Sequence, residues 1–184
     1  MQAKLLEVLM QYKTENPEHT IYGIFDGVKY PMLWSDLEDG ILTYDMLFRE
    51  EVLRLEMERV APFFVALDFT KDTDIEQTKE LLKCYGENGS LFLATSLNFE
   101  NTLERMRELF YVYNSKSEVG YFRFYWSTVF TEFVKQTHKN VLFNLFYDIH
   151  QYWCENAMEI DTISSYQYKN NQIQIIDKRL KNEI

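Results

Sequence analysis

The stretch of residues 120–131, GYFRFYWSTVFT, constrains the fold more than any other part of the chain. Residues 121–126 are all aromatic except Arg123, and so many rings in a row do not suit an exposed loop. Alternating side chains would place three rings on one face of a strand and the arginine on the other. Ser127 then opens a helical pattern of apolar residues. The stretch therefore predicts a strand that runs directly into a helix.

Further segments upstream repeat this change between strand and helix. Runs of apolar and β-branched residues predict strands, and apolar residues at helical spacing predict helices. Strands are expected at 21–25, 63–69 and 91–95, with helices at 2–12, 31–37, 50–59, 73–85 and 99–113. The alternation predicts an α/β fold, in which a mixed sheet is flanked by helices.

The pattern becomes more helical after residue 126. Helices are expected at 127–134 and 141–146, followed by a strand at 149–154 and a terminal β-hairpin around Asn170-Asn171. We therefore expect a larger α/β lobe over residues 1–126 and a smaller, mainly helical lobe with a tail over residues 127–184. Together the two lobes form one functional unit.

Charge and composition limit the classes of partner. The formal net charge is −10, which argues against nucleic acid and against anionic membrane surfaces, because both require clustered Lys and Arg. No run of about 18 apolar residues is present, and the N-terminal segment does not fit a signal peptide. The cysteines, Cys84 and Cys154, fit no disulfide framework. These features predict a cytoplasmic protein.

The sequence places no reacting side chain near the partner that its chemistry would require. His19, His138 and His150 are far apart in sequence and predict no metal site. No glycine-rich phosphate loop or nucleophile elbow occurs, so no cofactor is expected. Asp26 and Asp68 lie at the ends of expected strands and are the best catalytic candidates, although a turn or cap role fits Asp26 better. The sequence motifs, taken without any family resemblance, favour a protein that is not an enzyme.

Several segments, in their order and spacing over residues 21–153, resemble the adaptor or effector-chaperone family of the bacterial type VI secretion system. The most specific is the run Phe-Arg-Phe-Tyr at residues 122–125. The others are Phe25-Asp26-Gly27, the patch at 44–48, Ala61-Pro62-Phe63-Phe64-Val65, Leu91-Phe92-Leu93 and Met106-Arg107-Glu108-Leu109-Phe110. This chain departs from the family in having Trp126-Ser127-Thr128 where Asp-Pro-Arg is usual.

The resemblance implies a cytoplasmic adaptor without catalytic activity. Such a protein binds one secreted toxic effector, usually by its N-terminal region, and helps to load it onto the secretion spike, whose tip protein is a further candidate partner. The alternatives are an immunity-type protein that binds a toxin and a small hydrolase that uses Asp26 or Asp68.

We hypothesise that apolar effector segments lie in an aromatic groove at the junction of the two lobes. For the two arginines, the alternative to partner contact is a structural salt bridge, and for the rings it is core packing. The residues expected to contact the partner are Tyr44, Phe48, Arg107, Arg123, Trp126 and Phe130.

Overall fold

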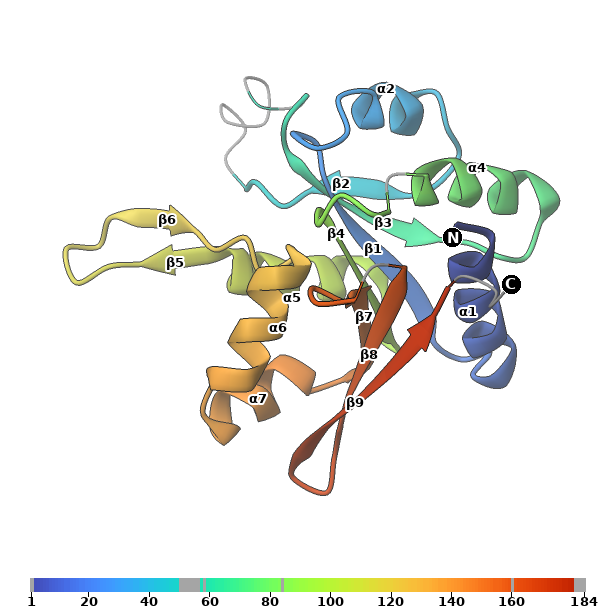
Figure 1. Ribbon diagram of the computed structural model, residues 1–184. Coiled ribbons are helices and arrows are strands. Elements are labelled where there is room, and N and C mark those ends of the chain that lie inside the picture. Colours follow the sequence, from blue (N-terminus) through green and yellow to red (C-terminus); the bar gives the residue numbers. More distant parts are fainter. Residues whose placement is uncertain (1, 50–56, 58, 84, 160, 181–184) are drawn as a thin grey trace.

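The computed structural model describes residues 2–49, 57, 59–83, 85–159 and 161–180. Figure 1 shows a large twisted sheet with helices on both sides and a narrow two-stranded arm that projects from the body. The helices are α1 (Gln2–Glu15), α2 (Leu33–Glu38), α4 (Asp72–Leu82), α5 (Phe99–Phe110), α6 (Ser127–Gln136) and α7 (Lys139–Phe146). The strands are β1 (Thr20–Asp26), β2 (Tyr44–Met46), β3 (Pro62–Leu67), β4 (Ser90–Thr95), β5 (Tyr111–Tyr113), β6 (Val119–Tyr121), β7 (Ile149–Glu155), β8 (Thr162–Lys169) and β9 (Gln172–Arg179).

The main sheet has the strand order β2-β3-β1-β4-β7-β8-β9, and β5 and β6 form a separate two-stranded sheet. All the strand pairs of the described residues are antiparallel, so the α/β class is confirmed while the sheet is antiparallel and not mixed. β1 is antiparallel to both β3 and β4, so these two strands run parallel to each other on either side of it, and α4 lies in the connection between them.

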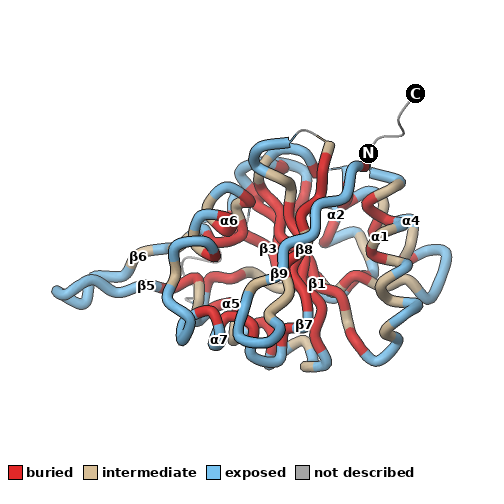
Figure 2. The backbone as a smooth tube through the Cα atoms, turned by 60° about the horizontal axis from the view of Figure 1, so that its bottom comes forward, coloured by how far each residue is buried: buried red, intermediate tan, exposed pale blue. Residues whose placement is uncertain are grey.

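The centre of the sheet is buried on both faces. Figure 2 shows buried backbone concentrated in β1, β3 and the neighbouring strands. Trp153 of β7 contacts the ring of Tyr12 of α1 on one face, whereas Tyr152 contacts Phe130 of α6 and Phe146 of α7 on the other. Helices on both faces explain why these strands are almost continuously apolar in sequence.

The part of the chain after residue 126 is less helical than predicted. It holds α6 and α7, but also β7, β8 and β9, which continue the sheet of the N-terminal part through the pairing of β4 with β7. The predicted terminal hairpin is confirmed as β8 and β9. Asn170 and Asn171 form its turn with φ of 53° and 60°, a conformation that asparagine tolerates better than most residues.

Two predictions around the arm are wrong. The helix predicted to reach residue 113 ends at Phe110, and residues 111–113 form β5 of the arm. The strand predicted over 121–126 ends at Tyr121, after which the chain turns. Phe124 and Tyr125 are neighbours and both are buried, which an alternating strand with one exposed face does not allow. The helix predicted at 50–59 falls mostly outside the described residues.

Candidate partner-binding site

A buried carboxylate holds Trp126 at the end of β1. The indole Nε1–H of Trp126 donates to Oδ2 of Asp26 at 2.6 Å, and the backbone N–H of Val28 donates to Oδ1 at 3.0 Å. Asp26 is 1% exposed, so these donors replace the water that its oxygens lose on burial. The predicted turn role of Asp26 is confirmed, and the same residue fixes the orientation of a half-buried tryptophan.

The start of α6 is fixed by a loop from elsewhere in the chain. Oδ1 of Asn88 accepts from the backbone N–H of Thr128 at 3.0 Å and from the hydroxyl of Ser127, so Asn88 caps α6 from outside the helix. The carboxylate of Glu155 in turn accepts from the backbone N–H groups of Gly86 at 2.9 Å and Asn88 at 3.0 Å. Burial raises the pKa of Glu155, and these hydrogen bonds oppose the rise.

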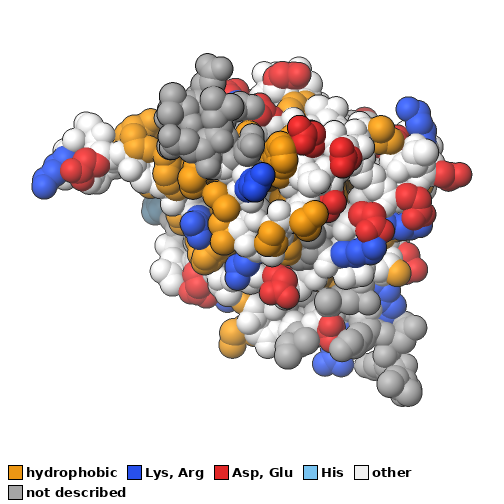
Figure 3. Space-filling model, turned by 90° about the horizontal axis from the view of Figure 1, so that it is seen from above, with side chains coloured by type: hydrophobic (Ala, Val, Ile, Leu, Met, Phe, Trp, Pro, Cys, Tyr) orange, Lys and Arg blue, Asp and Glu red, His pale blue; other side chains and the backbone are white. Residues whose placement is uncertain are grey.

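Two cations flank the Trp126 ring in this acidic protein. The guanidinium carbon of Arg123 lies 4.9 Å from the ring centroid, and Nζ of Lys29 lies 5.7 Å from it. Arg123 is exposed, and so are Val28 and Met32, two apolar side chains close to Lys29 in the sequence. Figure 3 shows hydrophobic side chains together with Lys and Arg on the face that carries the arm. We call Val28, Lys29, Met32, Arg123 and Trp126 the tryptophan platform.

An apolar groove runs along the outer side of α6. It has a volume of about 500 Å³, and its lining includes Phe122, Val129 and Phe133 with Glu132 as its one charged residue. The rings of Phe122 and Phe133 are in contact, with centroids 5.1 Å apart. Because Phe122 leads directly into Arg123, the groove and the tryptophan platform belong to the same part of the surface.

The projecting arm carries apolar side chains into solvent. Tyr113 is 65% exposed, and Val112, Val119 and Tyr121 are exposed as well. The pairing of Tyr113 with Val119 and of Tyr111 with Tyr121 puts the side chains of these two pairs on one face of the arm, and Val112 lies on the opposite face. At its root, the ring of Tyr121 stacks on Phe110 at 5.1 Å. The arm thus extends an apolar surface from the core of the protein outward.

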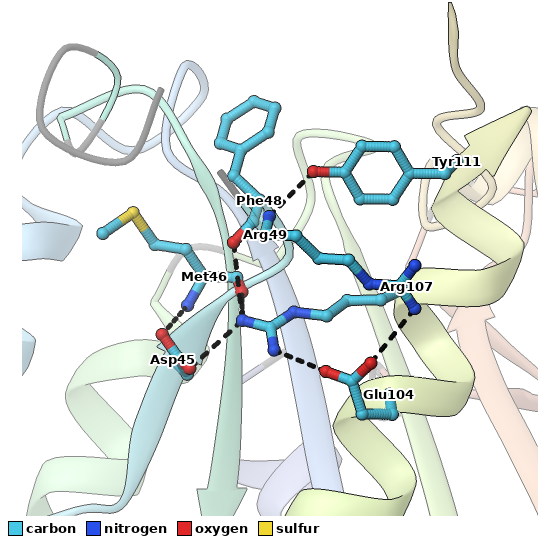
Figure 4. Close-up of polar contacts among 7 residues, drawn as sticks. All are labelled: Asp45, Met46, Phe48, Arg49, Glu104, Arg107 and Tyr111. Atoms are coloured by element: carbon cyan, nitrogen blue, oxygen red, sulfur yellow. Dashed lines mark hydrogen bonds and ion pairs between the residues drawn. The ribbon is translucent and has the colours of Figure 1, made fainter. Parts of the chain in front are cut away.

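Arg107 lies inside the protein and holds β2 against α5. Its Nη2 donates to Oδ2 of Asp45 at 3.1 Å and to the carbonyl of Met46 at 2.7 Å, and its Nη1 donates to Oε1 of Glu104 at 2.7 Å. Figure 4 shows the guanidinium enclosed by these groups. Hydrogen bonding from Arg107 lowers the pKa of Glu104. Arg49 joins the cluster by donating to Oε2 of Glu104 at 3.1 Å.

The contacts distribute the six predicted contact residues over three places, so they do not line a single groove. Arg123 and Trp126 meet at the tryptophan platform, as just described. The second place lies around α5 and β2, where Tyr44 is half-buried and both Phe48 and Arg107 are buried. The third place is the core, where Phe130 is 0% exposed and packs on Tyr152 and Tyr166. Its ring therefore has no surface left for a partner.

Sequence reasoning missed Lys29, which is exposed, and Val129 and Phe133, which are half-buried, as parts of the candidate site. Val129 and Phe133 are four residues apart, and that helical spacing was available as a signal, although it fits core packing equally well. Lys29 gave no signal, because its approach to Trp126 depends on the turn after β1.

The two carboxylates considered for hydrolysis lie at opposite ends of the sheet. Asp26 ends β1, while Asp68 follows Leu67, which pairs with Ile21 near the start of β1. Burial acts to raise the pKa of Asp68, but hydrogen bonds from Thr70 outweigh it and the pKa is lowered. The two groups therefore cannot work as a pair.

Among the described residues, no three His, Cys, Asp or Glu side chains cluster in a way that could hold a metal ion. None of the described helices has the length and apolar character required to cross a bilayer. Comparisons with protein-family models, with curated proteins and with solved structures found no match.

Proposed function

We propose that this protein is an adaptor that binds a secreted effector of a type VI secretion system through the surface formed by the tryptophan platform, the α6 groove and the arm. The observation that carries the proposal is the apolar surface of these features, which is exposed on the tryptophan platform and the arm and partly exposed in the lining of the α6 groove. Exposed apolar surface of this kind is typical of partner-binding sites. The resemblance of residues 21–153 to the adaptor family supplies the class of partner.

An amphipathic helix of the effector is the ligand that suits the α6 groove. The groove lies along a helix and has an apolar floor, as in helix-in-groove recognition. Trp126 and Arg123 belong to the residue types that most often dominate binding energy at such sites. The arm would cover the bound helix from one side, because a two-stranded ribbon with exposed apolar residues gains stability by packing.

A co-purification experiment tests the proposal. The effector encoded beside this gene is co-expressed with and without its N-terminal segment, and complex formation is measured by size-exclusion chromatography and calorimetry. We expect a complex that requires the N-terminal segment. The variants Arg123→Glu and Tyr113→Ser should each weaken it about tenfold, equivalent to about 1.4 kcal/mol. Lys71→Glu, an exposed charge reversal at the start of α4, serves as the matched control.

The outcomes separate the proposal from its alternative. Full binding by both surface variants, with unchanged circular dichroism spectra, would show that this surface is not the site. A complex that forms through the toxic domain of the effector and blocks its activity would instead support the hypothesis that this is an immunity-type protein. If no complex forms with a folded effector, the adaptor proposal is refuted.

A further inference from the structure

A second groove lies elsewhere in the fold, between α1 and the β7, β8 and β9 strands. It has a volume of about 590 Å³. Figure 1 shows α1 and β9 on one side of the molecule and the arm on the other, so this groove is separate from the α6 groove. The residues that matter for the argument are Glu15, His150, Trp153, Lys169, Ile176 and Lys178.

The floor of the groove is held rigid by a stack of rings. The hydroxyl of Tyr12 and Nδ1 of His19 are hydrogen-bonded at 2.9 Å, and the rings of His19 and His150 stack with centroids 3.8 Å apart. The edge of Tyr12 also meets Trp153, with centroids 4.8 Å apart. Nε2 of His19 faces the carboxylate of Glu18 at 3.2 Å. Side chains fixed in this way form a preorganised surface, which lowers the entropy that a ligand must offset on binding.

Lysines stand at the two ends of the groove. Lys169 pairs with Gln172 across the hairpin turn, and Lys178 lies six residues further along β9, so that both side chains point to the same face. At about 3.3 Å per residue, the two positions are separated by about 20 Å. Neither lysine forms a salt bridge with another of the described residues. Among the described residues that line the groove, Glu15 is the one carboxylate, in a chain of net charge −10.

Between the two lysines, the groove offers an apolar contact and polar side chains. Ile176 is 59% exposed and lies in the middle of β9. Gln151 and Gln167 are joined to each other through their amide groups and contribute the polar lining beside it. A ligand that uses the whole groove therefore needs an apolar group at its centre and negative charges near both ends.

We propose that this groove binds an extended acidic peptide segment of a partner protein. A small anion could reach one lysine only, whereas an extended chain of about seven residues spans about 20 Å and can place a carboxylate at each end. An apolar side chain in its middle would pack on Ile176. The proposal does not depend on the effector proposal, because the two grooves share no residue.

A peptide selection tests the inference without knowledge of the partner. The probe is a phage-displayed library of random peptides about ten residues long, which is long enough to span the groove. Peptides recovered on the wild-type protein are synthesised, and their binding is measured by fluorescence polarisation. We expect acidic residues about six positions apart, and at least about tenfold weaker binding to the Lys169→Glu/Lys178→Glu variant. Lys71→Glu is again the matched control.

A reversed-charge peptide makes the test sharper. Replacing the two acidic residues of a recovered peptide by lysines should abolish binding to the wild type and restore it on the double variant. The proposal is overturned if the selection yields no peptide, if recovered peptides lack paired acidic positions, or if they bind the double variant as well as the wild type. It is also overturned in favour of a second copy of this chain if the wild type dimerises in sedimentation and the double variant does not. Binding of the effector by the double variant should be unchanged.

Discussion

Replacing Arg107 by methionine should destabilise the fold strongly, because the guanidinium is buried between α5 and β2. Methionine keeps most of the apolar stem and removes the charge, so the variant isolates the polar contacts. The loss includes the cation facing Asp45 at 3.1 Å and the donor to the carbonyl of Met46 at 2.7 Å.

The magnitude follows from the burial of the partners. Removing one partner of a buried ion pair costs about 3–5 kcal/mol, and a charged hydrogen bond contributes about 1.5–3 kcal/mol. The side chain of Asp45 is 25% exposed, so water compensates part of its charge and the lower end of the range applies. Glu104 is 54% exposed and adds little. We therefore expect Arg107→Met to lower the free energy of unfolding by about 3 kcal/mol.

Urea denaturation followed by circular dichroism measures this change. With a slope of about 2 kcal/mol per molar urea, the midpoint should fall by about 1.5 M. Glu104→Gln is the matched control, since it removes a mostly exposed charge from the same cluster and should cost about 1 kcal/mol or less. A loss below about 1 kcal/mol for Arg107→Met would refute the reasoning. It would restore Arg107 as a candidate for direct partner contact.

Two further predictions concern the histidine stack and the hairpin turn. Burial and the neighbouring His150 lower the pKa of His19, so the folded state binds this proton less readily than the unfolded state. The free energy of unfolding should therefore fall as the pH drops below the unfolded histidine pKa of about 6.5, and it should level off below the folded pKa. His19→Gln should remove this dependence and His138→Gln should retain it, as followed by urea midpoints. Asn171→Ala should cost about 1 kcal/mol in thermal unfolding because φ at this position is 60°. Asn171→Gly should cost nothing measurable, and equal stability of the two variants would contradict the turn assignment.

Local sequence determined the elements that depend on near neighbours in the chain. Asn98 is a typical N-cap residue type directly before the apolar pattern of α5, and its side chain accepts from the backbone N–H of Asn101 at 3.0 Å. The turn at Asn170 and Asn171 was likewise predicted from two residues between alternating runs. The apolar segment that became β3 was recognisable because burial on both faces leaves a continuous apolar run. For the cap and the turn the physical cause acts within a few residues, whereas for β3 the local pattern records the burial of both faces.

Tertiary structure decided the features that join distant parts of the chain. Trp126 donates to Asp26, which lies 100 residues away, and Arg107 meets Asp45 over 62 residues. The aromatic stretch after Tyr121 carries the alternation of a strand, yet the neighbours Phe124 and Tyr125 are both buried in the folded protein. Sequence pattern records which side chains leave water, and only the packed fold decides which groups they meet there.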